Sequence, residues 1–149
     1  MRKIIFVCTG NTCRSPMAEA IARDIFSKKN IDIEVCSRGV AVYFPAEATT
    51  ESSAAISAYG LSLSGHRATQ ITLEDVKSAE LILAMTSQHK AFVKQLSEDN
   101  VDSKVFTLKE YIRESDMDIT DPYGGDLCVY KACLEALYLY ISRFADLLQ

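Results

Sequence analysis

The stretch IIFVCTGNTCRSPMAEAIARDIF, residues 4–26, decides the fold class of this chain. It begins inside an apolar run, Lys3 to Cys8, that is typical of a buried strand. It continues into Pro16 to Lys29, where apolar residues recur at helical spacing. Nine residues, CTGNTCRSP at 8–16, connect the two patterns. A strand, a short polar loop and a helix in this order predict the first unit of an α/β domain.

The connecting loop places a thiol at Cys8 and a guanidinium at Arg14. Such a loop can turn its backbone N–H groups inward and bind an anion beside the N-terminus of the following helix. An arginine fork matches two phosphate oxygens, which a lysine cannot do. The helix end and the arginine both favour a thiolate, so we expect Cys8 to be largely ionised near neutral pH. The pattern predicts an enzyme that holds phosphate while sulfur attacks it.

The other residues of the loop suit the same task. Gly10 lets the backbone approach an anion closely and permits a positive φ, and Asn11 tolerates the left-handed region while its amide braces the loop. Ser15 either caps the helix that Pro16 begins or donates a hydrogen bond to the Cys8 sulfur, and we favour the second use. The predicted phosphate-binding residues are Thr9, Gly10, Asn11, Thr12, Cys13 and Ser15.

The chain has five cysteines, an odd number that fits reduced thiols better than a disulfide framework. A lone cysteine at the end of an apolar strand is usually a small core residue, but the Gly, Asn, Arg and Ser-Pro that follow Cys8 favour a nucleophile. We interpret Cys36, Cys128 and Cys133 as packing residues, because their spacing matches no zinc pattern. A bridge between Cys8 and Cys13 on oxidation is a further hypothesis.

Length and charge limit the function classes. At 149 residues the chain predicts a single domain over 1–149, and the net charge of −4 without a basic stripe argues against a nucleic-acid partner. The apolar run at residues 4–7 is far shorter than the roughly 18 residues of a membrane span, and no other run approaches that length. We therefore expect a cytoplasmic protein with no membrane partner.

The rest of the chain continues the alternation of strands and helices. We expect strands at 31–37, 81–85 and 105–107, a helix from Pro45 to about Tyr59, a short helix from Thr72, and a helix capped by Thr86 or Ser87 that runs to about Leu96 with His89 facing solvent. A last helix begins near Asp126, and its apolar stripe predicts one core-facing helix rather than a coiled coil. The stripe contains Leu127, Tyr130, Leu134, Leu137, Ile141, Phe144 and Leu148. The alternation predicts a parallel sheet covered on both faces, with a ligand site beyond the carboxyl ends of its strands.

Chemistry through a thiolate also needs a proton donor for the leaving group. Asp121 is the candidate, because it begins DPYGG (121–125), a run of turn residues suited to a loop that closes over bound phosphate. An Asp-Pro pair is equally common as a plain turn, so spacing alone leaves both interpretations open. Asp118 is nearby but lacks the motif. Tyr123 either lines the pocket wall or anchors the loop.

Five segments together resemble the low-molecular-weight protein tyrosine phosphatase family, bacterial branch, with the protein arginine phosphatases most similar. They are VCTGNTCRSPMAEA (7–20), SRG (37–39), GHRATQIT (65–72), LAMTSQHK (83–90) and DPYGG (121–125). The resemblance implies a three-layer domain with a four-stranded parallel sheet in the order 2-1-3-4. It implies a phosphocysteine at Cys8, Arg14 binding phosphate, Asp121 as general acid and then base, and no metal or cofactor. We expect a phosphorylated protein as partner and a monomer.

The resemblance also bears on the less specific residues. A single histidine such as His66 is more often structural than catalytic, but the family's matching His and Ser imply that His66 and Ser37 brace Asn11. Thr12 resembles the arginine-directed members and its hydroxyl can accept from a guanidinium, whereas Tyr123 is common in tyrosine-directed ones. We expect phosphoarginine as substrate, with phosphotyrosine as the alternative. A thioredoxin-coupled arsenate reductase fits less well, since residues 81–90 contain no cysteine, and so does a non-enzymatic phosphate-binding module.

Overall fold

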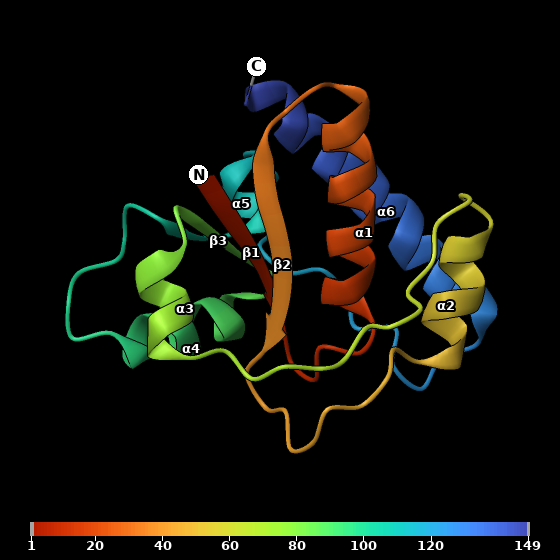
Figure 1. Cartoon of the computed structure of the whole chain (residues 1–149), viewed down its shortest axis with the longest axis horizontal. Coiled ribbons are helices and arrows are strands. Elements are labelled where there is room, and N and C mark those ends of the chain that lie inside the picture. Colours follow the sequence, from red (N-terminus) through yellow and green to blue (C-terminus); the bar gives the residue numbers. More distant parts are fainter. Residues whose placement is uncertain (1, 149) are drawn as a thin grey trace.

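The computed structural model describes residues 2–148 as alternating strands and helices (Figure 1). Four parallel strands form one sheet in the order β2-β1-β3-β4, which confirms the expected order. The strands are β1 (Arg2–Cys8), β2 (Ile33–Gly39), β3 (Leu81–Ala84) and β4 (Val105–Thr107). The helices are α1 (Arg14–Lys28), α2 (Thr50–Ser57), α3 (Leu73–Ser78), α4 (Ser87–Leu96), α5 (Leu108–Tyr111) and α6 (Leu127–Leu147).

Helices cover both faces of the sheet, as the alternation predicts. Ile4 and Phe6 of β1 point into the larger apolar cluster, which α1 and α6 cover, whereas Ile5 and Val7 point into a second cluster beneath α3 and α4. Figure 1 shows α1, α2 and α6 together on one side of the sheet and α3 and α4 on the other. Because successive side chains alternate between faces, an inner strand buried on both sides reads as a continuous apolar run.

Helix α1 begins two residues before the expected start at Pro16. Cys13 occupies the position before the first turn and makes no side-chain cap, and Ser15 lies inside the helix. Capping of the helix by Ser15, the less favoured of its two predicted uses, is therefore wrong. Pro16 is tolerated in this first turn, where its missing N–H would have no intrahelical acceptor.

The second helix is shorter than expected. It covers Thr50–Ser57 and not Pro45 to Tyr59, because Thr49 is the cap and accepts from the backbone N–H of Ser52. The backbone before Thr50 forms hydrogen bonds with other segments. The Thr49 N–H donates to the Thr12 carbonyl at 2.9 Å, and the Ala46 carbonyl accepts from the Ala68 N–H. These tertiary hydrogen bonds outweigh the local helix propensity, so the residues before Thr49 stay outside the helix.

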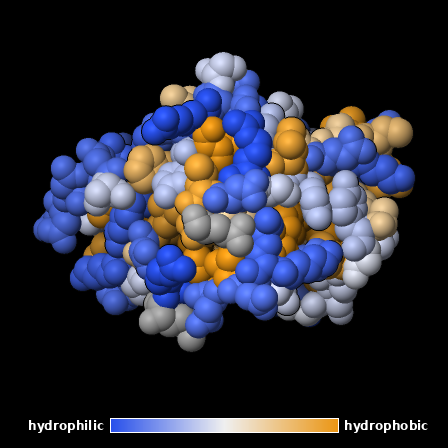
Figure 2. Space-filling view, turned by 90° about the horizontal axis from the view of Figure 1, so that it is seen from above, coloured by the Kyte–Doolittle hydropathy of each residue, from blue (hydrophilic) through white to orange (hydrophobic). Residues whose placement is uncertain are grey.

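The last helix faces the core, as its stripe predicts. Tyr130, Leu134, Leu137, Ile141 and Phe144 are fully or almost fully buried, and α6 packs along α1. No helix within residues 2–148 is both long and apolar enough to cross a membrane. Viewed onto the amino ends of the strands, Figure 2 shows apolar residues near the centre of the face with hydrophilic ones around them.

The cysteines predicted to pack do so only in part. Cys133 is buried and Cys36 is half-buried, but Cys128 is exposed on α6, so its interpretation as a packing residue is wrong. The helical position explains the difference, because Cys133 shares the core side of α6 with Leu134 and Leu137, whereas Cys128 faces away from it.

Gly39 fits the end of β2 against the loop that follows β1. A Cβ at Gly39 would lie 2.6 Å from the Thr9 carbonyl oxygen, 2.6 Å from Val42 Cγ2 and 3.0 Å from the Asn11 nitrogen. Real Cβ atoms do not approach backbone atoms this closely, so only glycine lets the two segments meet. Hydrogen bonds from Val40 N–H to the Cys8 carbonyl and from Ala41 N–H to the Thr9 carbonyl, both 3.0 Å, extend this contact.

We expect Gly39→Ala to lower the free energy of unfolding by about 1–3 kcal/mol, because the added methyl group must displace the backbone of the loop as well as the Val42 side chain. Chemical denaturation measures the change. Gly10→Ala is the matched control, since the nearest atom to a Cβ there is Thr12 Oγ1 at 3.7 Å. Equal stabilities of the two variants would contradict the packing argument.

Candidate active site

The loop between β1 and α1 forms the floor of the site. Within residues 2–148, the backbone N–H groups of residues 9–13 donate to no backbone carbonyl. The left-handed residue of the loop is Asn11, with φ of 56°, in agreement with its tolerance of this region, whereas Gly10 does not use the positive φ that it permits. Asparagine is one of the few residues that adopt this conformation at low cost. Unpaired N–H groups beside a helix N-terminus favour an anion.

The Asn11 side chain and carbonyl tie the loop to three other segments. Asn11 Nδ2 donates to Ser15 Oγ at 2.7 Å and to Ser37 Oγ at 3.0 Å. Asn11 Oδ1 accepts from the Thr69 N–H at 2.9 Å, and the Asn11 carbonyl oxygen lies 2.7 Å from His66 Nε2. The structure thus brings His66, Ser37 and Asn11 together. It adds the backbone of Thr69, a residue of the segment GHRATQIT to which the sequence analysis gave no role of its own.

The Cys8 sulfur lies at the start of the loop, buried and 2.8 Å from Ser15 Oγ. Ser15 Oγ already accepts from Asn11, so its single proton goes to the sulfur or to the Arg38 carbonyl oxygen, which is 3.4 Å away. The shorter distance favours the sulfur. Donation from a hydroxyl stabilises a thiolate more than a thiol, and this is the use of Ser15 that the sequence analysis preferred.

Arg14 is buried beside the loop and only partly bonded. Its Nη1 donates to the Ile119 carbonyl at 2.9 Å, and its Nη2 lies 3.4 Å from Thr9 Oγ1 and 3.5 Å from Asp121 Oδ2. Its Nε is buried with no hydrogen-bond partner among the described residues. A buried N–H of a cation costs free energy when it has no hydrogen-bond acceptor. The unpartnered Nε therefore indicates a position where a ligand can supply the acceptor.

The segment that carries Asp121 is fixed at its beginning and open at its tip. Asp118 accepts from the Ser87 N–H at 2.8 Å, and the Ile119 N–H donates to the Met85 carbonyl at 2.8 Å. Asp121 itself is half exposed, and its Oδ1 accepts from the Tyr123 N–H at 3.0 Å. Asp118 therefore holds the N-terminus of α4, while Asp121 faces the arginine.

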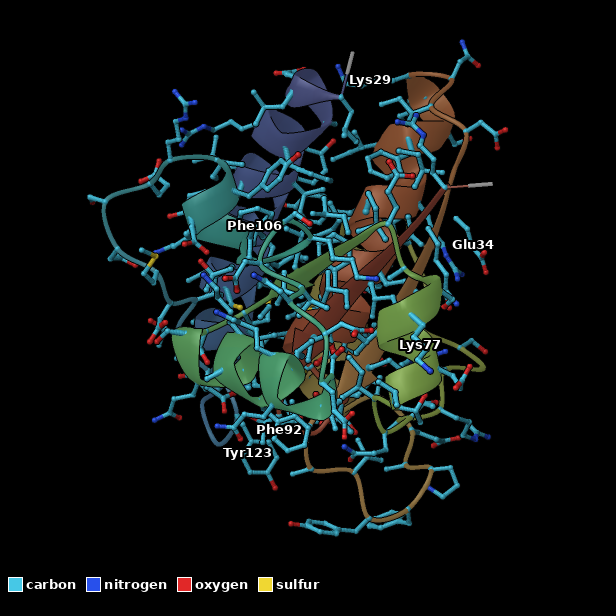
Figure 3. The ribbon with its side chains drawn as sticks, turned by 90° about the vertical axis from the view of Figure 1, so that its left-hand side faces the viewer. Lys29, Glu34, Lys77, Phe92, Phe106 and Tyr123 are labelled. Carbon is cyan, nitrogen blue, oxygen red and sulfur yellow. The ribbon has the colours of Figure 1, made fainter. Side chains whose placement is uncertain are left out.

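Tyr123 is 73% exposed as a residue, so its ring does not anchor this segment. Figure 3 shows Tyr123 projecting at the same end of the molecule as Phe92 of α4, far from Lys29 at the other end. The aromatic ring is free to contact a bound side chain at the rim of the site.

Cys13 lies between the loop and the acid. Its sulfur is 3.8 Å from Asp121 Oδ1, toward which its thiol donates. Burial raises the pKa of Cys13 to about 12, and the negative charges of Cys8 and Asp121 add to the increase. Cys13 therefore stays protonated at neutral pH, which makes its thiol a poor nucleophile.

His89 faces the site and not solvent, so its predicted exposure is wrong. It is 5% exposed, its Nε2 lies 2.8 Å from Thr9 Oγ1, and its Nδ1 is buried without a partner among the described residues. Burial lowers the pKa of His89 to about 4, with the nearby Arg14 charge adding to the decrease. The spacing of His89 and Val93, both buried on one side of α4, is the sequence signal that could have found it.

The site contains donors for an anion. No group of three or more His, Cys, Asp or Glu residues within 2–148 could hold a metal ion. The loop N–H groups and Arg14 surround a sulfur atom, and Asp121 faces them. This arrangement can bind a phosphoryl group, attack it with sulfur and move a proton to or from the atom on its far side.

Comparisons with known proteins agree with this geometry. Residues 3–149 match the family model described as low molecular weight phosphotyrosine protein phosphatase. The chain is 40% identical to a protein-arginine-phosphatase of Bacillus subtilis over 98% of its length and 96% of the relative's. It is 33% identical to the low molecular weight protein-tyrosine-phosphatase PtpB of Staphylococcus aureus, over 98% and 99% of the two chains. A solved structure of the YwlE arginine phosphatase, a cysteine-to-serine mutant with a phosphorylated active site serine, superposes with a TM-score of 0.92 at 39% identity over 98% of this chain and 95% of that one.

The buried imidazole predicts a pH-dependent stability. An unfolded histidine titrates near 6.5, so above that pH neither state is protonated and His89 contributes no penalty. As the pH falls from about 6.5 towards 4, the unfolded chain binds a proton that folded His89 refuses, and the free energy of unfolding decreases by about 1 kcal/mol per pH unit.

We expect the wild type to lose about 1–2 kcal/mol more than His89→Gln between pH 6.5 and pH 5, measured by urea denaturation. Comparing the two proteins cancels the contributions of the carboxylates. Parallel pH curves would show that the histidine is not held neutral in the folded state.

Proposed function

Because this chain belongs to the low molecular weight phosphotyrosine protein phosphatase family, we propose that Cys8 carries out its catalysis as a phosphocysteine and that phosphoarginine on proteins is its preferred substrate. Membership makes the chain a hydrolase that acts as a cysteine-dependent protein phosphatase. The observation that carries the residue assignment is the buried Cys8 sulfur at the mouth of a loop whose N–H groups have no backbone acceptor.

Binding of the phosphoryl group uses the donors left free in the site. Its oxygens accept from the N–H groups of residues 9–13 and from the Arg14 guanidinium, whose Nε has no other partner among the described residues. Positioning and fixed donors supply most of the rate enhancement in phosphoryl transfer, because little covalent chemistry remains for the protein. The hydrogen bonds of Asn11 to Ser37 and His66 hold the loop in place, so these donors stay convergent.

The first step transfers the phosphoryl group to sulfur. The Cys8 thiolate forms the S–P bond as the bond from phosphorus to the leaving nitrogen or oxygen breaks, and Asp121 donates its proton to the leaving atom. The position of Asp121 beside Arg14, with its side chain 48% exposed, leaves it access to that atom. The phosphorylated active site serine of the YwlE mutant supports a covalent intermediate at this position of the fold.

The second step returns the enzyme to its starting state. Asp121, now ionised, accepts a proton from water as the water oxygen bonds to phosphorus and the S–P bond breaks. Cys8 leaves as a thiolate, which Ser15 stabilises, and inorganic phosphate is the product. All residues of this cycle come from one copy of the chain, so we propose a monomer as the active unit, and a reducing compartment, the cytoplasm, as its place of action.

Two observations favour phosphoarginine. The relatives that are 40% identical over nearly the full chain are protein-arginine-phosphatases, from Bacillus subtilis and Geobacillus stearothermophilus. Thr12 offers a hydroxyl that can accept from a substrate guanidinium, and its carbonyl is fixed by the Thr49 N–H at 2.9 Å. The loop therefore presents the Thr12 side chain from a backbone that cannot easily shift.

Phosphotyrosine is the alternative substrate. The exposed ring of Tyr123 at the rim can stack on an aromatic side chain, and relatives that are 33–38% identical are protein-tyrosine-phosphatases. The two substrates differ at the leaving atom and in the hydrogen-bond donors around it, so Thr12 is the residue whose exchange separates them.

We expect Cys8→Ser to lose turnover by about a thousandfold or more while it still binds inorganic phosphate, because the donors remain and the nucleophile does not. A rapidly quenched reaction of the wild type, followed by peptide mass spectrometry, should place phosphate on Cys8. Cys128→Ser, on the exposed side of α6, is the control and keeps full activity. Substantial activity of Cys8→Ser would rule out the covalent route.

For Thr12→Ile we expect the ratio of kcat/KM for phosphoarginine to phosphotyrosine peptides to fall about tenfold, which corresponds to about 1.4 kcal/mol of discrimination. Thr12→Val separates the loss of the hydroxyl from the gain of bulk, because valine keeps the size of threonine. A ratio that is unchanged in both variants would show that Thr12 does not select the substrate.

A further inference from the structure

His89 is a buried imidazole at the edge of the site that the phosphatase cycle does not use. It lies in the first turn of α4, where the Thr86 hydroxyl accepts from the His89 backbone N–H at 3.2 Å and fixes the turn. From this turn the ring reaches across to the loop after β1, and its Nε2 lies 2.8 Å from Thr9 Oγ1. Its Nδ1 has no partner within the described chain.

Thr9 links this ring to the phosphate-binding arginine. Thr9 is exposed, so packing does not fix its side chain, and its hydroxyl lies between His89 and Arg14 Nη2, the latter at 3.4 Å. A guanidinium only donates hydrogen bonds, so the Thr9 oxygen accepts from it. Among the described residues, the Thr9 oxygen is therefore the atom that joins His89 to Arg14 by hydrogen bonds.

We propose that His89 is a positioning residue, which holds the Thr9 hydroxyl against the Arg14 guanidinium and so keeps the arginine aimed at phosphate. The proposal rests on the phosphate-binding role of Arg14 given above. It assigns a catalytic purpose to a contact between α4 and the loop, two segments that lie 80 residues apart in the chain.

The protonation of the ring fits this role. Neutral imidazole has one N–H, and a proton on Nδ1 would leave a buried donor unpaired, so the tautomer with the proton on Nε2 is favoured. In this tautomer Nε2 donates to the Thr9 oxygen, which then accepts from both His89 and Arg14. The Thr9 proton remains free to point at a phosphate oxygen of the substrate.

The contact matters because Arg14 has a competing partner. The same Nη2 lies 3.5 Å from Asp121 Oδ2, a carboxylate that attracts the guanidinium more strongly than a hydroxyl does. A closer Arg14–Asp121 pair would take the arginine from phosphate and would hold Asp121 ionised when the first step needs its proton. The Thr9 hydroxyl, fixed by His89, gives the same Nη2 a neutral acceptor that competes with the acid.

Two amide variants separate the hydrogen bond from simple filling of space. The terminal nitrogen of glutamine reaches about as far as Nε2 of histidine, whereas that of asparagine reaches only as far as Nδ1. We expect His89→Asn to raise the inhibition constant of inorganic phosphate about 3- to 10-fold and to lower kcat for a chromogenic aryl phosphate by a similar factor. His89→Gln should recover most of both losses.

A double-mutant cycle tests whether the effect passes through Thr9. Thr9→Val removes the hydroxyl at constant size, and because Thr9 is exposed this change leaves the core intact. We expect Thr9→Val to lose at least as much as His89→Asn, because it also removes the hydroxyl proton that can point at phosphate, and Thr9→Ser to restore the wild-type values. The double variant should be no worse than Thr9→Val alone. Gln88→Ala, exposed in the same turn of α4, is the control and behaves as wild type.

Three results would overturn the proposal: equal losses in His89→Asn and His89→Gln, additive losses in the cycle, or Thr9→Val with wild-type phosphate inhibition. Each is measured against the wild type with the same aryl phosphate, so a wild type that hydrolyses it normally keeps the phosphatase assignment intact when the His89 proposal fails. If His89→Asn does not fold, judged by its thermal melt, the comparison of Thr9→Val with Thr9→Ser decides the question.

Discussion

The site depends on keeping a ring of backbone N–H groups unpaired in the absence of a ligand. Such groups cost free energy when they have no acceptor, so the chain favours any collapse that pairs them. Asn11 prevents the collapse: its left-handed backbone turns the loop, and its side chain bonds to Ser15, Ser37 and the backbone of Thr69. The Asn11 amide thereby uses its donors and its acceptor to keep the loop N–H groups available for the oxygens of a bound anion.

The parallel sheet explains why residues distant in the chain meet here. Because all four strands point the same way, the segments that follow β1, β2 and β3 leave the sheet at one edge. The loop after β1 supplies the sulfur, the segment after β2 contacts it through Gly39, and α4 after β3 supplies His89. Asp121 comes later in the chain. The Ile119 N–H pairs with the Met85 carbonyl just after β3, which places Asp121 at the same carboxyl ends of the strands.

The sequence was sufficient to predict those parts of the fold in which the local pattern of apolar residues fits only one kind of element. The apolar run of β1, the stripe of α6 and the strand order that the resemblance implied all agree with the structure. It was insufficient where tertiary contacts decide: Thr49 caps α2 because the preceding backbone bonds to Thr12 and Ala68, and His89 lies inward with its Nε2 against Thr9 Oγ1. A local pattern cannot reveal such partners, since they are contributed by segments 20 to 80 residues away.

The bond from Arg14 Nη1 to the Ile119 carbonyl has a consequence for protein engineering. This main-chain oxygen belongs to the segment that delivers the acid, so the arginine's orientation is specified by a stretch about 105 residues further along the chain. Grafting residues 8–16 alone onto a foreign scaffold would move Cys8 and Arg14 without the Ile119 carbonyl that orients the Arg14 guanidinium. A designer who wants this chemistry elsewhere must therefore move both loops as one rigid pair.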